Sequence, residues 1–137
     1  MAGYSGTPLA KKIGIKERSR IALVNAPKDF QSVLGELPAN VQFIKQTAKS
    51  LDIILFFVLT ERALAKDFSK LAARLNASGM IWIAWPKKSS GVATDLTFDR
   101  VQRIGLAAGL VDVKICAVDD TWSGLKFVYR LKDRHQR

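Results

Sequence analysis

The strongest constraint on the fold is a set of short, almost wholly apolar runs. The two clearest cover residues 51–59 (LDIILFFVL) and 80–85 (MIWIAW). Apolar side chains at every position, with many β-branched and aromatic residues, are typical of strands buried on both faces of a parallel sheet. Neither run approaches the ~20 residues that a bilayer requires, so we expect no membrane-spanning segment.

Amphipathic stretches separate these runs and predict helices. We expect strands over residues 20–25, 40–46, 51–59, 80–85, 111–118 and 125–131. Helices are expected over 27–37, from a Thr60 cap to residue 76 with Ser78-Gly79 as terminator, and over 97–108. This alternation predicts an α/β fold: a three-layer, Rossmann-like, mostly parallel sheet with helices on both faces. The last turn is too short for a crossover, so the last strand should return antiparallel.

The chain length predicts one domain. All 137 residues fit a single Rossmann-like unit, with a flexible N-terminus over 1–7 and a basic tail over 132–137. No secretory signal is recognisable, and the single cysteine, Cys116, excludes an internal disulfide. We therefore expect a cytoplasmic protein that does not associate with membranes.

A formal net charge of +10 favours anionic partners, such as nucleic acid, phosphorylated metabolites or acidic surfaces. The alternative is that the basic residues only form solvated faces that keep the protein soluble. Much of the charge lies in two clusters near the chain ends: Lys11, Lys12, Lys16, Arg18 and Arg20, and then Arg130, Lys132, Arg134 and Arg137.

Ligands of open α/β sheets bind outside the carboxyl ends of the strands. This rule selects polar and aromatic residues that follow the predicted strands or lie in the loops there. The candidate ligand-binding residues are Asn25, Thr60, Trp85, Lys87, Lys88, Ser89, Asp95, Asp119, Asp120 and Trp122.

Two readings of these candidates stay open. Lys87 and Lys88 can hold a phosphate or carboxylate while a tryptophan stacks on a flat ring; alternatively, the lysines pair with Asp119 or Asp120 and both tryptophans pack in the core. Asp95 either caps the following helix or faces the pocket.

Several kinds of site are not expected. The only histidine, His135, lies in the tail, away from any serine, and zinc needs several Cys or His ligands. Asp119 and Asp120 are sequence neighbours whose carboxylates need not point the same way, so we expect no metal there. No GxxxxGK[ST] phosphate loop is present, and the sequence predicts no resident cofactor.

Two resemblances are visible. The succession SG, MIWIAWPKK, loop, helix, strand and antiparallel strand resembles the second half of a class I methyltransferase domain. Such enzymes carry a glycine-rich turn after the first strand, whereas this chain reads VNAPKDF, and no acidic residue ends the second strand. The segments GYSGTPLAKKIGI, WPKKSSGVATDL and VDDTWSGLKFV resemble the bacterial domain-of-unknown-function family 3052, which implies a compact Rossmann-like domain without an established activity.

The sequence thus predicts a non-catalytic or regulatory binding module for a small anionic ligand or a protein partner. A divergent methyltransferase-like enzyme, or another nucleotide-using transferase, is the first alternative. A nucleic-acid binder that uses the basic surface is the second.

Overall fold

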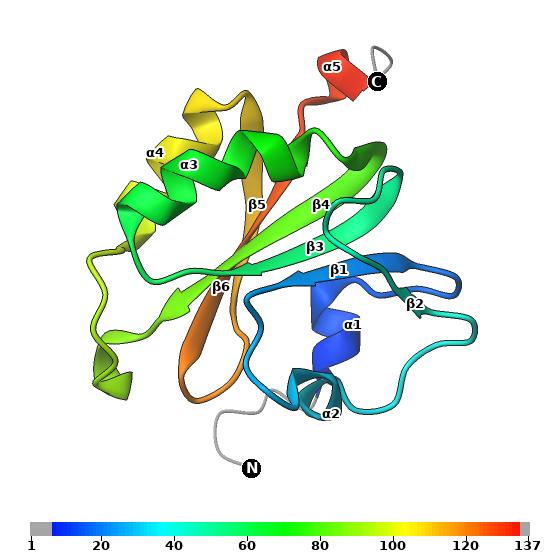
Figure 1. Cartoon of the computed structure of the whole chain (residues 1–137), viewed down its shortest axis with the longest axis horizontal. Helices are drawn as coiled ribbons and strands as arrows, with labels where there is room; N and C mark the ends of the chain where they lie inside the picture. The colour runs from blue at the N-terminus through cyan, green and yellow to red at the C-terminus, as the bar shows by residue number, and fades with distance from the viewer. Residues whose placement is uncertain (1–6, 135–137) are drawn as a thin grey trace.

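In the computed structural model, which describes residues 7–134, six strands form one mixed sheet in the order β2-β1-β3-β4-β6-β5 (Figure 1). β1 pairs in parallel with β2 and β3, and β3 with β4, whereas β6 runs antiparallel to β4 and β5. The predicted mostly parallel sheet with an antiparallel last strand is confirmed. The strands are β1 (Arg20–Val24), β2 (Gln42–Phe43), β3 (Leu51–Phe57), β4 (Leu75–Pro86), β5 (Leu110–Ala117) and β6 (Trp122–Tyr129).

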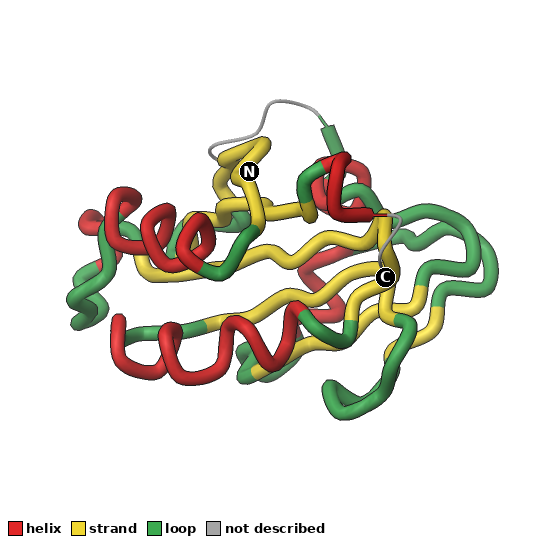
Figure 2. Tube along the Cα trace, turned by 90° about the horizontal axis from the view of Figure 1, so that it is seen from above, coloured by secondary structure: helices red, strands yellow, loops and turns green. Residues whose placement is uncertain are grey.

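Helices cover both faces of this sheet. The helices are α1 (Leu9–Ile13), α2 (Phe30–Leu34), α3 (Glu61–Ala72), α4 (Phe98–Ala107) and α5 (Leu131–Arg134), with a 3₁₀ turn, η1, over Lys88–Ser90. One core cluster joins α3 and α4 to the sheet, and a second joins α1 and α2 to its other face. Figure 2 shows the two longest helices running along the strands. The predicted three layers are therefore confirmed.

Two helix boundaries differ from the predictions. The helix predicted to run to residue 76 ends at Ala72, and Ser78-Gly79 lies inside β4 instead of ending a helix. A methyl group at Gly79 would lie 3.0 Å from the carbonyl oxygen of Leu51, so this glycine permits close approach of two strands where their register shifts. The predicted helix over 27–37 is shorter, because α2 forms only one turn before Gly35 takes a positive φ.

The two ends of the chain are only partly described. Residues 1–6 and 135–137, which include most of the predicted flexible N-terminus and His135, lie outside the described residues. Residues 131–134 form the short helix α5 within the segment predicted as a tail. None of the helices over 7–134 is long and apolar enough to cross a membrane.

Candidate functional site

The loop after β4 and the turn between β5 and β6 meet at the carboxyl edge of the sheet. The backbone N–H of Lys87 donates to the carbonyl oxygen of Thr121 at 2.8 Å. Within the turn, one carboxylate oxygen of Asp119 accepts from the N–H groups of Thr121 and Trp122, at 2.8 and 2.9 Å. These bonds fix the shape of the turn and place Lys87 beside it.

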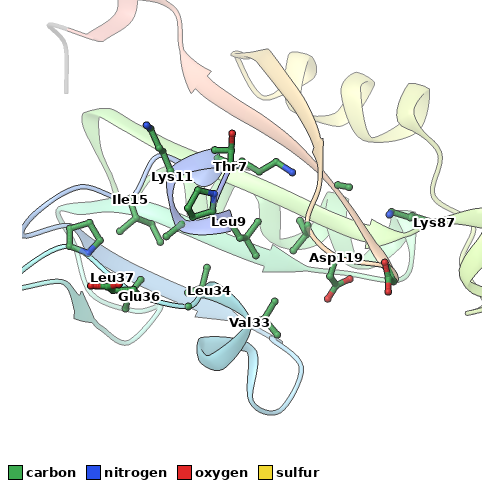
Figure 3. Close-up of a pocket in the computed structure, with 18 residues that line it drawn as sticks. Thr7, Leu9, Lys11, Ile15, Val33, Leu34, Glu36, Leu37, Lys87 and Asp119 are labelled. Atoms are coloured by element: carbon green, nitrogen blue, oxygen red, sulfur yellow. The ribbon is translucent and has the colours of Figure 1, made fainter. Parts of the chain in front are cut away.

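An open groove of about 870 Å³ begins at this rim and extends between α1 and α2 (Figure 3). Figure 3 shows Lys87 and Asp119 at one end and Glu36 and Leu37 at the other. Its walls are mostly apolar side chains from α1, from the end of α2 and from the end of β5. The wall residues used below are Leu9, Ile15, Val33, Leu34, Leu37 and Val118.

The polar end of the groove is not closed by ion pairs. Within residues 7–134 the one ion pair joins Arg100 to Glu61, so neither Lys87 nor Lys88 pairs with Asp119 or Asp120. The reading in which these lysines pair with Asp119 or Asp120 is therefore wrong. The hydrogen bond between the backbone of Lys87 and Thr121 joins the two segments instead. The Lys87 side chain, half-buried on the groove wall, stays available to an anion.

The tryptophans pack and do not form a stacking platform. Trp85 is 6% exposed and lies in the core beneath α3 and α4. Trp122 is partly buried on the other face, where its ring meets Phe57 edge to face at a centroid distance of 5.1 Å. Packing in the core, the second of the two readings above, therefore describes both rings.

Thr60 and Asp95 both cap α3. The Thr60 hydroxyl accepts from the N–H of Ala63 at 3.1 Å, as predicted, and a carboxylate oxygen of Asp95 accepts from the N–H of Glu61 at 2.8 Å. The helix that follows Asp95 is capped by Thr97 instead, so the prediction that Asp95 caps it is wrong. The loop folds back because Thr94 donates to the carbonyl of Leu59 at 2.6 Å and Arg100 pairs with Glu61 at 3.3 Å.

Asp120 is exposed and lines the groove beside Asp119, whereas Asn25, Lys88 and Ser89 lie outside the groove lining. Asn25 is exposed and adopts a left-handed backbone with φ 57°, at the place where Rossmann folds carry their first glycine. Asparagine tolerates this conformation better than most residues. Lys88 and Ser89 are exposed on η1.

The sequence analysis missed the walls of the groove. Val33 has the spacing of an apolar helix face together with Phe30 and Leu34, yet it is 46% exposed and lines the groove with Leu37. The sequence feature that indicates this exposure is the pair Gly35 and Pro38, which ends α2 too early for the helix to cover a sheet face fully. Helix α1 contributes Leu9, Lys11 and Lys12, and in the sequence the two lysines stand out only by their charge.

The architecture resembles class I methyltransferases. The chain is similar to fibrillarin from Aeropyrum pernix with natively bound S-adenosyl-L-methionine (TM-score 0.58, 12% identity, covering 92% of this chain and 70% of that one). It is also similar to a TehB-like SAM-dependent methyltransferase from Corynebacterium glutamicum (0.59, 11%, 94% and 91%). A third is magnesium protoporphyrin IX methyltransferase from Synechocystis with bound SAM (0.59, 10%, 89% and 74%).

The class of fold is therefore a Rossmann-like, methyltransferase-like fold. No protein-family model and no curated protein matches the chain, so membership of family 3052 stays a prediction.

The residues at the turn after β1 do not fit S-adenosylmethionine bound where Rossmann folds hold a dinucleotide. The turn after β1 carries side chains at Asn25, Ala26 and Pro27, where close backbone approach to a ligand favours glycine. At the neighbouring strand end, two of the free N–H groups of α3, the helix that follows β3, are already used by Thr60 and Asp95. Among the described residues, no three His, Cys, Asp or Glu side chains are grouped to hold a metal ion either.

Proposed function

We propose that this protein is a non-catalytic binding module that holds a small ligand with an apolar body and an anionic end. The observation that carries the proposal is the groove between α1 and α2, whose mostly apolar walls end at Lys87. The apolar body lies along Val33, Leu34 and Leu37, and the anionic group accepts from the Lys87 ammonium. A protein partner stays an expectation.

Two features support binding without catalysis. One carboxylate oxygen of Asp119, at the groove end, accepts two backbone N–H bonds that hold the turn, which gives this side chain a structural role. The N-terminus of α3, where the unpaired N–H groups of a helix can attract an anion, already holds the Asp95 carboxylate.

Fluorescence titration with 8-anilinonaphthalene-1-sulfonate tests the proposal, because this probe joins an aromatic body to one sulfonate. Lys87→Gln should weaken binding about tenfold, the effect of losing about 1.4 kcal/mol of a charge-assisted contact. Lys88→Gln, which removes the same charge from an exposed neighbour outside the groove, should leave the affinity unchanged. Equal effects of the two substitutions would contradict the assignment.

A second pair of variants tests the apolar wall. Val33→Glu should abolish binding, because it places a carboxylate among the apolar side chains of the groove, whereas Ser32→Glu on the adjacent exposed position should not. N-phenyl-1-naphthylamine, which has the same rings without the sulfonate, should bind more weakly and ignore Lys87→Gln. Tighter binding of the uncharged probe than of the sulfonate would show that the groove has no anion site.

A divergent methyltransferase is the second candidate, and it is supported by the fold shared with methyl-donor enzymes. Isothermal titration with S-adenosylmethionine separates the two. The binding-module proposal expects no heat at millimolar donor, because the turn after β1 and the start of α3 offer no place for it. Saturable binding would favour the enzyme.

A further inference from the structure

Four lysines from distant parts of the chain gather on the α1 side of the β5–β6 half of the sheet. Lys114 of β5 and Lys126 of β6 are direct cross-strand partners, so both side chains leave the same face of the sheet. The Lys114 ammonium donates to the carbonyl oxygen of Lys12 at 3.1 Å, which places the end of α1 against this face. We define the lysine face by these residues: Lys12, Lys16, Lys114 and Lys126.

Lys16 joins the same group. The pKa of Lys126 is lowered by burial first, and then by the positive charges of Lys114 and Lys16. Lys12 and Lys114 likewise act on the Cys116 thiol, which lies two residues along β5 from Lys114. Lys126 therefore lies within electrostatic range of Lys114 and Lys16, and the hydrogen bond from Lys114 joins Lys12 to the same group.

No ion pair joins these lysines to a carboxylate within residues 7–134. The one ion pair there, between Arg100 and Glu61, belongs to the helices on the opposite face. Like charges placed directly opposite one another across two strands are destabilising. The opposed lysines therefore lower the stability of the fold and concentrate positive charge on one face. Such a face suits a negatively charged partner.

We propose that the lysine face binds the phosphate backbone of a nucleic acid without reading its sequence. Closely spaced ammonium groups match a polyanion with regularly spaced charges, and the chain carries a net charge of +10 that adds long-range attraction. Between Val111 and Cys116, the β5 residues and their β6 partners on this face include no aromatic side chain on which a base can stack. The contacts are therefore to phosphates and not to bases.

Fluorescence polarisation with a labelled duplex DNA of mixed sequence tests this site. Four phosphate contacts should give a slope of about −3.6 in log affinity against log salt, since each contributes about −0.9. Affinity should then fall roughly 150-fold between 50 and 200 mM salt. No binding at 50 mM salt would overturn the proposal.

Matched variants separate the lysine face from net charge. Lys114→Gln/Lys126→Gln should reduce the slope to about −1.8, whereas Lys66→Gln/Lys70→Gln, with the same total charge but exposed on α3, should leave it near the wild-type value. Equal losses in both double variants would overturn the site. Lys12 is left unchanged because it also lines the groove.

Two further readouts keep the test decisive. Removing the opposed lysines should leave the melting temperature unchanged or higher, because repulsion between them is relieved. A folded Lys114→Gln/Lys126→Gln variant that binds duplex as the wild type does would refute the site. Competition with polyglutamate tests the other class of partner: if it displaces the wild-type protein better than unlabelled duplex at equal charge, the face is an acidic-protein site and the nucleic-acid proposal fails.

Discussion

Gly105 lies where α4 crosses β6, and replacing it tests how tightly this helix is packed. A methyl group at Gly105 would lie 2.0 Å from Cε2 of Phe127 and 2.5 Å from Cδ2 and Cζ of the same ring. Optimal carbon–carbon contacts are about 3.5–4.0 Å, so the ring would have to move by about 1.5 Å. Phe127 is fully buried and packs edge to face on Phe68 at 5.3 Å, which leaves it little space to yield.

Two opposing terms set the expected stability of Gly105→Ala. Alanine gains about 1 kcal/mol over glycine in a helix interior, whereas overpacking a rigid core costs about 1–3 kcal/mol and occasionally more. The displacement required here places the cost at the upper end, so we expect a net loss of about 2 kcal/mol. For a domain of this size, that lowers the melting temperature by about 6–10 °C.

Urea unfolding followed by far-UV circular dichroism measures this loss, and two variants control it. Ala65→Gly, at an exposed position in the interior of α3, should cost about 1 kcal/mol and so calibrates the propensity gain. Phe127→Leu should make Gly105→Ala neutral or stabilising in its background, because the clashing ring is gone. A Gly105→Ala protein that is more stable than the wild type would refute the packing described for α4.

Two other predictions follow from single contacts. Asp95→Ala should lower the free energy of unfolding by about 1 kcal/mol, because the α3 cap is lost, and thermal unfolding measures this change. Binding of 8-anilinonaphthalene-1-sulfonate should stay intact. Unchanged stability would mean that the cap is not formed. Burial raises the pKa of the Cys116 thiol above its ordinary value of 9.0, against the opposing effect of Lys12 and Lys114. The stability that this protonated thiol contributes is thus present below pH 9 and is lost as pH rises through the raised pKa. The rate of iodoacetamide labelling should therefore have its inflection at a higher pH in the native than in the guanidinium-unfolded chain. An inflection at a lower pH in the native chain would reverse this assignment.

The layers of the fold were predictable because burial leaves a local signal. Residues 51–57 and 80–85 are apolar at nearly every position, and each forms the strand expected of a sequence covered on both faces. The end of α3 was not predictable in this way. Gly79 reads as a helix terminator along the chain. In the structure a methyl group there would lie 3.0 and 3.2 Å from the carbonyl oxygens of Leu51 and Asp52, which come from the neighbouring strand, and 3.1 Å from that of Asn76.

The candidate site was predictable only where chain neighbours carry it. The rim formed by Lys87 and Asp119 follows from strand ends and the edge rule for α/β sheets. The groove walls arise from two one-turn helices with weak periodicity, and the lysine face arises from a cross-strand pair. The contact between Lys12 and Lys114 spans 102 positions, so no local pattern announces it.

The capping of α3 removes one helix N-terminus that could otherwise bind an anion. A helix N-terminus attracts an anion because its first N–H groups are unpaired and its dipole is positive there. Here Asp95 supplies that anion from within the chain, and the Thr60 hydroxyl takes another N–H group. A phosphate at the start of α3 would have to displace the Asp95 carboxylate, which the chain itself holds in place. Lys87 and the lysine face, in contrast, have no carboxylate partner among residues 7–134. We therefore expect an anion to bind at Lys87 or the lysine face in preference to the start of α3.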